Sequence, residues 1–374
     1  MMTRFVTTIL IVIATAGCEP RGEVVLDPTA GRVGTVETIF VGTTRGADAE
    51  TGVEFSKTRS QTARFARLDV SIPPDRELGN ISWPRPNRQP DAKSEFLAVN
   101  EVIYPGAAGF RADLARTLAN EARGAREAVI YIHGFNNNFA EGAYRIAQLG
   151  HDLGAKGAFV HYSWPSRAHP LAYAYDRDSA LFARDGLEEL LSQVEAAGAE
   201  RMLLVAHSMG AALTMETLRQ MAIAKNHALL SKISGVVLIS PDIDVDVFRA
   251  QARRVGNLPQ PFIIFTSKKD RALALSARLT GQHDRLGNVT DIEEIADLKV
   301  TMLDTTAFST GVGHFNAGNS PALLIILGKL SEVDDAFTGD QTGRTGLLPG
   351  AVLTLQNATQ IVLSPVAAIS SAQP

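Results

Sequence analysis

The stretch from Met202 to Leu218 constrains this chain more than any other. A short apolar run, Met202 to Val205, predicts a buried strand, and helix-forming residues follow Ala206-His207-Ser208-Met209-Gly210. Small residues on both sides of Ser208 let a strand turn sharply into a helix without a clash. The pattern therefore predicts a nucleophilic serine exposed at the tip of a strand–helix turn. The competing interpretation is an ordinary helix N-cap, a position where serine is also preferred.

Strands and helices alternate on both sides of this turn, which predicts a mostly parallel sheet with helices on both faces. Apolar runs predict strands at 38–43, 67–72, 96–104, 128–132, 159–162, 202–206, 236–239, 262–266 and 300–303. Helical spacing of apolar residues predicts helices at 111–123, 138–153, 178–197, 245–255, 273–279 and 323–330.

The first eighteen residues have the features of an export signal. Arg4 precedes an apolar run from Phe5 to Ala14, and small residues then lead to Cys18. This run is too short for a membrane span. The small residues before Cys18 resemble a bacterial lipoprotein cleavage site, which implies lipid on Cys18 and a membrane-anchored protein of the periplasm or cell envelope. A simple cleaved signal and a secreted protein are the alternative.

Length, composition and net charge limit the partners and cofactors that we expect. The chain has 374 residues, 45% of them hydrophobic, with a net charge of -4 and one cysteine, so we expect no nucleic-acid partner and no internal disulfide. We expect a signal at 1–18, a tether at 19–35, one catalytic domain at 36–330 and a low-order tail at 331–374. No common metal or nucleotide motif occurs, so neither kind of cofactor is expected.

A serine nucleophile needs a base and an acid that orients the base. His314 lies in a Gly-flanked loop after the last predicted domain strand, whereas His227 comes too early and His283 follows no strand. Two acids follow strands, Asp270 and Asp242. Both fit the order serine, acid, histidine, but the acid more often follows the later strand, which favours Asp270, with Asp242 as the alternative acid or as a support for the site.

The tetrahedral intermediate of acyl transfer needs backbone N–H donors. We expect one from Met209 and the second from Phe135, where Gly134 permits a close approach of the loop. His133 and His207 are interpreted as structural. Trp164 follows its own strand and either shapes the pocket wall or packs as an aromatic in a turn.

Several motifs in this order resemble a bacterial family of α/β hydrolases without an assigned function. They are FVGTTR (40–45), RLDVSIPP (67–74), HGFN (133–136), SWPS (163–166), AHSMG (206–210), SPDID (240–244), SKKDRAL (267–273) and GHFN (313–316). The resemblance covers roughly residues 36–330. It implies the α/β-hydrolase fold, with Ser208, Asp270 and His314 as the triad, and it implies no particular substrate.

The sequence thus predicts a serine hydrolase that cleaves a carboxylic ester or similar acyl bond of a small molecule or lipid. A non-catalytic binding or scaffold protein with the same fold is one alternative, because fold alone does not prove activity. An acyltransferase that uses an acceptor other than water is another.

Overall fold

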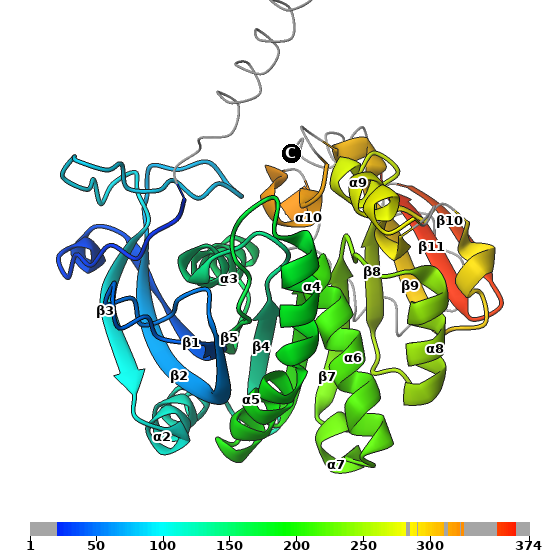
Figure 1. The fold of residues 1–374 in the computed structure, drawn as a ribbon, viewed down its shortest axis with the longest axis horizontal. Helices are drawn as coiled ribbons and strands as arrows, with labels where there is room; N and C mark the ends of the chain where they lie inside the picture. Colours follow the sequence, from blue (N-terminus) through cyan, green and yellow to red (C-terminus); the bar gives the residue numbers. More distant parts are fainter. Residues whose placement is uncertain are drawn as a thin grey trace, which may run out of the picture.

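The computed structural model describes residues 21–281, 285–289, 291–309, 313–321, 323–324 and 350–363. Within them, eleven strands form one sheet in the order β10-β11-β9-β8-β7-β6-β4-β5-β1-β2-β3 (Figure 1). The strands are β1 (Thr35–Arg45), β2 (Arg59–Ile72), β3 (Leu97–Tyr104), β4 (Glu127–Ile132), β5 (Ala158–Ser163), β6 (Arg201–His207), β7 (Ile233–Ile239), β8 (Phe262–Thr266), β9 (Val300–Asp304), β10 (Gly350–Leu355) and β11 (Ala358–Leu363).

The helices follow the strands along the chain. They are α2 (Ala107–Leu118), α3 (Phe139–Leu153), α4 (Tyr173–Phe182), α5 (Arg184–Ala196), α6 (Met209–Ile223), α7 (His227–Leu230), α8 (Val245–Val255), α9 (Arg271–Leu279) and α10 (Asn316–Asn319). Short 3₁₀ turns lie at Ala30–Arg32, Leu286–Asn288, Ile292–Ile295 and Thr306–Phe308.

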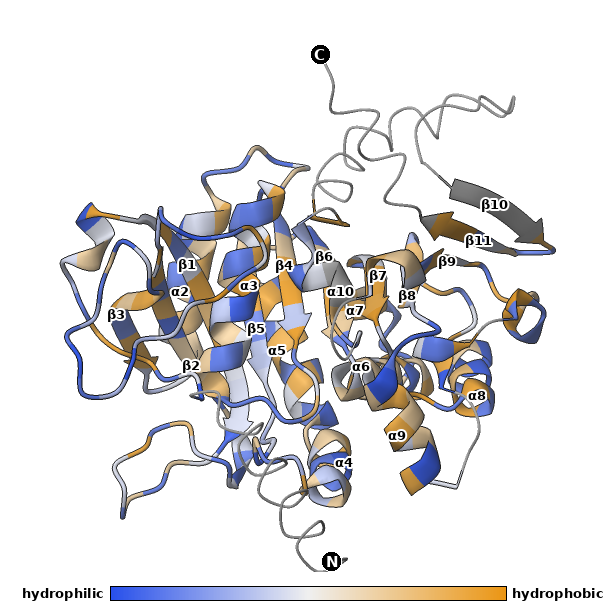
Figure 2. Cartoon of the chain, turned by 90° about the horizontal axis from the view of Figure 1, so that it is seen from above, coloured by the Kyte–Doolittle hydropathy of each residue, from blue (hydrophilic) through white to orange (hydrophobic). Residues whose placement is uncertain are grey.

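The centre of the sheet is parallel, as the sequence predicts. Strands β11, β9, β8, β7, β6, β4, β5 and β1 pair in parallel, and only β1-β2-β3 and β10-β11 are antiparallel. Both faces are apolar because successive side chains of a strand point to opposite sides. Ile130 and Ile132 of β4 join the core shared with α5, α6 and α8, whereas Val129 and Tyr131 join the core shared with α3. The central strands are accordingly coloured mainly as hydrophobic in Figure 2.

Helix α3 fixes the loop that follows β4. Its N-cap, Asn138, accepts a hydrogen bond from the Glu141 amide at 2.9 Å, and the Glu141 carboxylate accepts one from the Asn138 amide at 2.9 Å. A reciprocal cap of this kind stabilises a helix start by roughly 1 kcal/mol. The loop between Ile132 and Asn138 is therefore held at both ends.

The expected tether at 19–35 is wrong for the residues that the structure describes. Residues 21–34 pack on the domain, where the Val25 carbonyl accepts from the Ala98 amide at 2.9 Å and the Asp27 amide donates to the Ala98 carbonyl at 2.8 Å. Ala30 is fully buried. Because the attachment to β3 uses backbone groups, the polar composition of the segment gave no sign of it.

The expected low-order tail is also wrong for residues 350–363. Strands β10 and β11 form a hairpin, and β11 extends the sheet by pairing Ala358–Val362 with Val300–Asp304 of β9. Ala358 and Ile361 are buried against the domain. The domain that we expected to end at residue 330 thus includes this hairpin.

Other boundaries shift by a few residues. The helix expected at 178–197 is two helices, α4 and α5, that meet at the fully buried Ala183. Most of the helix expected at 323–330 lies outside the described residues, as do the predicted signal with Cys18, and His283. No helix in the described part of the chain is long and apolar enough to cross a membrane.

Candidate active site

Ser208 stands at a strained turn between β6 and α6. Its φ is 52° and its ψ is −120°. Residues other than glycine rarely adopt this backbone conformation, and strained conformations of this kind cluster at functional sites. Its side chain makes no capping hydrogen bond, so the interpretation as an ordinary N-cap has no support. The turn is tight because Gly210 lies against β4: a Cβ on Gly210 would be 2.3 Å from the His133 carbonyl oxygen.

Asp270 and His314 meet at the carboxyl end of the sheet. The Nδ1 atom of His314 lies 2.8 Å from Oδ2 and 3.0 Å from Oδ1 of Asp270, whose side chain is fully buried. Asp270 also caps α9 by accepting from the Leu273 amide at 3.0 Å, where the helix dipole favours its negative charge. A proton on Nδ1 that is donated to this carboxylate leaves Nε2 with a free lone pair.

Ser208 and His314 line the same small pocket, whose volume is about 90 Å³. Its other walls are mainly apolar and come from the loop after β4, the start of α4 and helix α9. They include Phe135, Pro170, Tyr173, Ala272, Leu273, Leu275 and Leu279. The pocket can hold an apolar group beside the serine.

Met209 and Phe135, the two expected oxyanion donors, both lie close to Ser208. Met209 is the first residue of α6, and the first amides of a helix have no partner within it. The loop carrying Phe135 passes close to the serine, since a Cβ on Gly134 would lie 2.9 Å from the Ser208 Cβ. The structure thus brings both expected donor residues next to Ser208.

Arg45, at the end of β1, holds the loop after β4 and the segment after β5 through hydrogen bonds. Its Nη2 donates to the Asn137 carbonyl at 2.9 Å, its Nη1 to the Ser166 carbonyl at 3.0 Å and its Nε to the Ser163 hydroxyl at 2.8 Å. Burial lowers the pKa of Arg45 to about 10, and the charge of Asp176 opposes that shift. The sequence interpretation quoted FVGTTR without a role for its arginine.

Asp176 on α4 supports the same loop. It accepts from the Ser166 hydroxyl at 2.5 Å, the Arg167 amide at 2.8 Å and the Asn136 amide at 3.4 Å. Burial raises the pKa of this carboxyl group. The loop after β4 is thus fixed by hydrogen bonds to two charged side chains, Arg45 and Asp176, rather than by regular secondary structure.

His133 and Trp164 pack together behind the loop. Their rings stack at 4.8 Å, and the Trp164 indole donates to the His133 carbonyl at 2.7 Å. Burial holds the pKa of His133 well below its usual range, so the imidazole is neutral. Trp164 is fully buried and does not line the pocket, so its interpretation as a pocket wall is wrong and the packed aromatic is right.

Asp242 does not meet the histidine. Its carboxylate accepts from the Tyr173 hydroxyl at 2.8 Å and the Ser276 hydroxyl at 2.6 Å, and it lies 3.3 Å from the Arg285 guanidinium. Burial and the charge of Asp242 raise the pKa of Tyr173 to about 12. Asp242 therefore fixes one wall of the pocket, while Asp270 is the acid placed behind His314.

His207 holds the loop of the candidate base, a role that the sequence did not reveal. Its Nε2 lies 3.3 Å from the His314 carbonyl, and its ring contacts the rings of His314 and Phe315 at 4.8 and 4.5 Å. Burial, followed by the charge of His314, keeps the pKa of His207 well below its usual range. The neutral ring can donate from Nε2 to that carbonyl.

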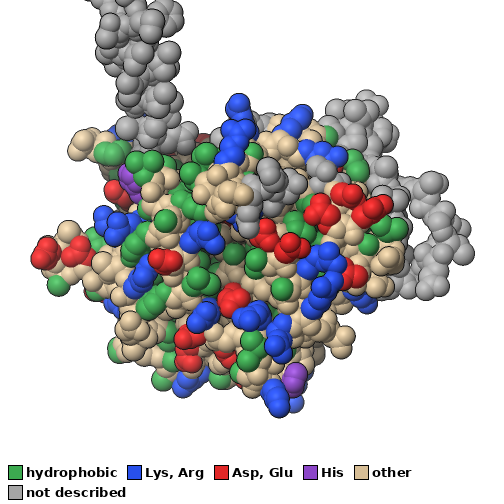
Figure 3. All heavy atoms as spheres, turned by 45° about the vertical axis from the view of Figure 1, so that its right-hand side comes forward, with side chains coloured by type: hydrophobic (Ala, Val, Ile, Leu, Met, Phe, Trp, Pro, Cys, Tyr) green, Lys and Arg blue, Asp and Glu red, His purple; other side chains and the backbone are tan. Residues whose placement is uncertain are grey.

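The surroundings add two observations. In the described part of the chain, no group of three or more His, Cys, Asp or Glu side chains is placed to hold a metal ion. On the face drawn in Figure 3, Lys and Arg side chains lie among Asp and Glu side chains rather than in one large field of a single sign.

Comparison with known proteins finds one family model that matches more than half of the chain. Residues 107–329 match the family model described as "Alpha/beta hydrolase of unknown function (DUF900)". A predicted CIB-like hydrolase from Thermoplasma acidophilum aligns at 15% identity over 56% of this chain and 88% of that one, with a TM-score of 0.35. Lipase B of Aspergillus fumigatus aligns at 12% identity over 39% of this chain and 38% of the lipase, with a TM-score of 0.27. A search of curated proteins finds no match.

Proposed function

The chain belongs to the α/β-hydrolase family of unknown function, and from this premise we propose that it is a serine hydrolase cleaving a carboxylic ester or similar acyl bond. The observation that carries the proposal is the contact of 2.8 Å between His314 and Asp270, with His314 and Ser208 in one pocket. A base oriented by a buried acid next to a serine on a strained turn is the arrangement that activates a hydroxyl.

The reaction uses the chain's own groups at each step. His314 Nε2 takes the proton from the Ser208 hydroxyl as the oxygen attacks the acyl carbonyl. The amides of Met209 and Phe135 donate to the oxyanion that forms. His314 then gives its proton to the leaving alcohol, and an acyl-enzyme remains on Ser208. Water, deprotonated by His314, attacks this ester and releases the acid.

The pocket supports an apolar acyl group as the substrate's reacting part. Leu273, Leu275 and Leu279 of α9 line it, and two of them are largely exposed, Leu275 at 58% and Leu279 at 64%. An acyl chain that leaves the small pocket would lie along these side chains and bury apolar surface worth about 25 cal/mol per Å².

The test is turnover of p-nitrophenyl esters of increasing chain length. Ser208→Ala should abolish turnover above background, whereas Ser231→Ala, the same change at an exposed serine whose hydroxyl donates to the Ala228 carbonyl, should leave it unchanged. Equal rates for Ser208→Ala and the unaltered protein would refute the proposal, and equal rates at the background level would favour a non-catalytic binding protein.

We also propose that the protein is exported and held at the membrane by lipid on Cys18. The proposal rests on the sequence around that residue, which lies outside the described part of the chain. Cells grown with radioactive palmitate should label the protein, and Cys18→Ala should remove the label. Label that persists in Cys18→Ala would contradict lipidation at this residue.

A further inference from the structure

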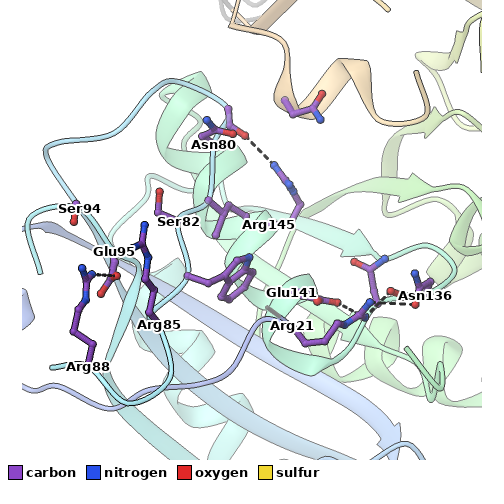
Figure 4. Close-up of a pocket in the computed structure, with 15 residues that line it drawn as sticks. Arg21, Asn80, Ser82, Arg85, Arg88, Ser94, Glu95, Asn136, Glu141 and Arg145 are labelled. Atoms are coloured by element: carbon purple, nitrogen blue, oxygen red, sulfur yellow. Dashed lines mark hydrogen bonds and ion pairs between the residues drawn. The ribbon is translucent and has the colours of Figure 1, made fainter. Parts of the chain in front are cut away.

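A second cavity, larger than the pocket at Ser208, has no role in the reaction above. This cleft has a volume of about 810 Å³ and lies between the β2–β3 loop, helix α3 and the N-terminal segment (Figure 4). It is mainly polar. Its lining includes four arginines, Arg21, Arg85, Arg88 and Arg145, and two carboxylates, Glu95 and Glu141.

The charges in the cleft do not cancel. Arg88 pairs with Glu95, and Arg21 pairs with Glu141 at 2.8 Å. Arg85 and Arg145 have no carboxylate within 4.0 Å among the described residues. Figure 4 shows Arg85 on one side of the cleft and Arg145 on the other. Two unpaired cations thus face a polar cavity in a protein whose net charge is negative.

Arg145 ties the cleft to the candidate active site. Its Nη1 donates to the Gly79 carbonyl at 3.1 Å and to the Gln148 side chain at 2.7 Å, and its guanidinium lies 5.0 Å from the ring of Phe315, the residue after His314. Asn136 also lines the cleft and follows Phe135, which lines the pocket. The loop after β4 therefore contributes to both the cleft and the pocket.

The N-terminal segment enters at this cleft. Arg21 Nη2 donates to the Asn136 carbonyl at 2.7 Å, and the Asn138 side chain donates to the Gly22 carbonyl at 2.7 Å. Gly22 packs so closely on Trp83 that an added Cβ would be 2.5 Å from the indole. Cys18 is three residues before Arg21 in the sequence, and three residues span at most about 11 Å.

We propose that this cleft binds a phosphate group through Arg85 and Arg145, and that the phosphate belongs to the headgroup of a membrane lipid. Arginine is suited to this ligand because its planar fork donates two hydrogen bonds to phosphate oxygens. The cleft is much larger than a phosphate ion and has room for a polar headgroup. The membrane as source rests on the proposed lipid on Cys18, which would hold the cleft at the bilayer surface.

Trp83 provides a direct reporter. The chain has two tryptophans; Trp164 is fully buried, whereas Trp83 lines the cleft. Full-length protein in neutral detergent is titrated with sn-glycerol 3-phosphate, and separately with micelles containing ether-linked phosphatidylglycerol, which has no ester to cleave. Micelles containing ether-linked dialkylglycerol, which lacks the phosphate, are the control. Intrinsic fluorescence is recorded throughout.

The expected result is a saturable fluorescence change that Trp83→Phe removes. Arg85→Ala should weaken binding at least about tenfold, because a hydrogen bond to a charged group is lost. Arg123→Ala, the same change at an exposed arginine outside the cleft, should not alter it. Tighter binding of the doped micelles than of glycerol phosphate identifies a lipid headgroup, and the reverse order identifies a free phosphate ester.

The proposal fails if neither ligand changes the fluorescence of Trp83. It also fails if Arg85→Ala and Arg145→Lys both bind as tightly as the unaltered protein. Because the readout is binding, it does not depend on Ser208, and the hydrolase proposal can fail while the cleft still binds phosphate.

Discussion

Gly134→Ala tests the position of the proposed oxyanion site most sharply. The added Cβ would lie 2.6 Å from His207 Nδ1 and 2.9 Å from the Ser208 Cβ, which is 0.8 and 0.5 Å short of the 3.4 Å at which ordinary contact begins. His207 cannot retreat freely, because its ring contacts His314 and Phe315. The loop must therefore move away from the serine by several tenths of an ångström.

That displacement carries the Phe135 amide away from the oxyanion. Loss of one oxyanion donor costs about 10²–10³ in kcat, and a misplacement near 1 Å costs about 10². We therefore expect kcat to fall at least about 100-fold for p-nitrophenyl butyrate, which corresponds to about 2.7 kcal/mol of transition-state stabilisation. KM should change much less, because the pocket walls formed by Pro170, Tyr173 and helix α9 stay in place.

The control for this variant is Gly106→Ala. Gly106 precedes α2, and a Cβ there would meet no atom within 4 Å. It should keep full activity, and circular dichroism should show both variants folded. A folded Gly134→Ala protein with kcat within threefold of the unaltered enzyme would refute the reasoning, since the loop could not then supply a donor.

Three further predictions address the acid, the brace and pH. Asp270→Asn should lower kcat by about 10⁴ because it favours the wrong tautomer of the base, whereas Asp242→Asn should lower it less than about tenfold; equal losses in steady-state assays would contradict the assignment. Arg45→Met leaves the buried Ser166 carbonyl without its donor and should lower the free energy of unfolding by about 2–3 kcal/mol in urea titrations; a change below 1 kcal/mol would exclude a bracing role. Burial lowers the pKa of His161 to about 3, while an unfolded histidine titrates near 6.5, so the unfolded state binds this proton first and the stability is lost as pH falls. Between about pH 6 and 4, the free energy of unfolding of His161→Leu should fall less steeply with decreasing pH, by about 1.4 kcal/mol per pH unit. If the slope is the same as in the unaltered protein, the prediction is wrong.

The sequence predicts the elements whose signals are local. Strand β8 and helix α8 begin and end where apolar periodicity places them, and the turn at Ser208 follows from small residues within five positions. Its place after the later strand favoured Asp270 over Asp242, and the structure brings Asp270 to His314. The local pattern is enough to predict that these side chains lie close together, because each of them follows a strand and parallel strands end at one edge of the sheet.

The features that the sequence missed depend on distant partners. The β10–β11 hairpin joins the sheet by pairing β11 with the backbone of β9. The amino-acid composition of the segment does not predict such pairing. Arg45 reaches the Asn137 carbonyl across 92 positions, and only the presence of an arginine at the end of an apolar strand hinted at a buried charge. The role of His207 likewise depends on His314, more than a hundred residues away.

Labelling with a fluorophosphonate probe tests the central claim most directly. Such a probe reacts with a serine only when a neighbouring base activates it. The folded protein should take up one probe molecule, mass mapping should place it on Ser208, and Asp270→Asn should slow its uptake strongly. An unlabelled folded protein, or an adduct on another residue, would contradict the account.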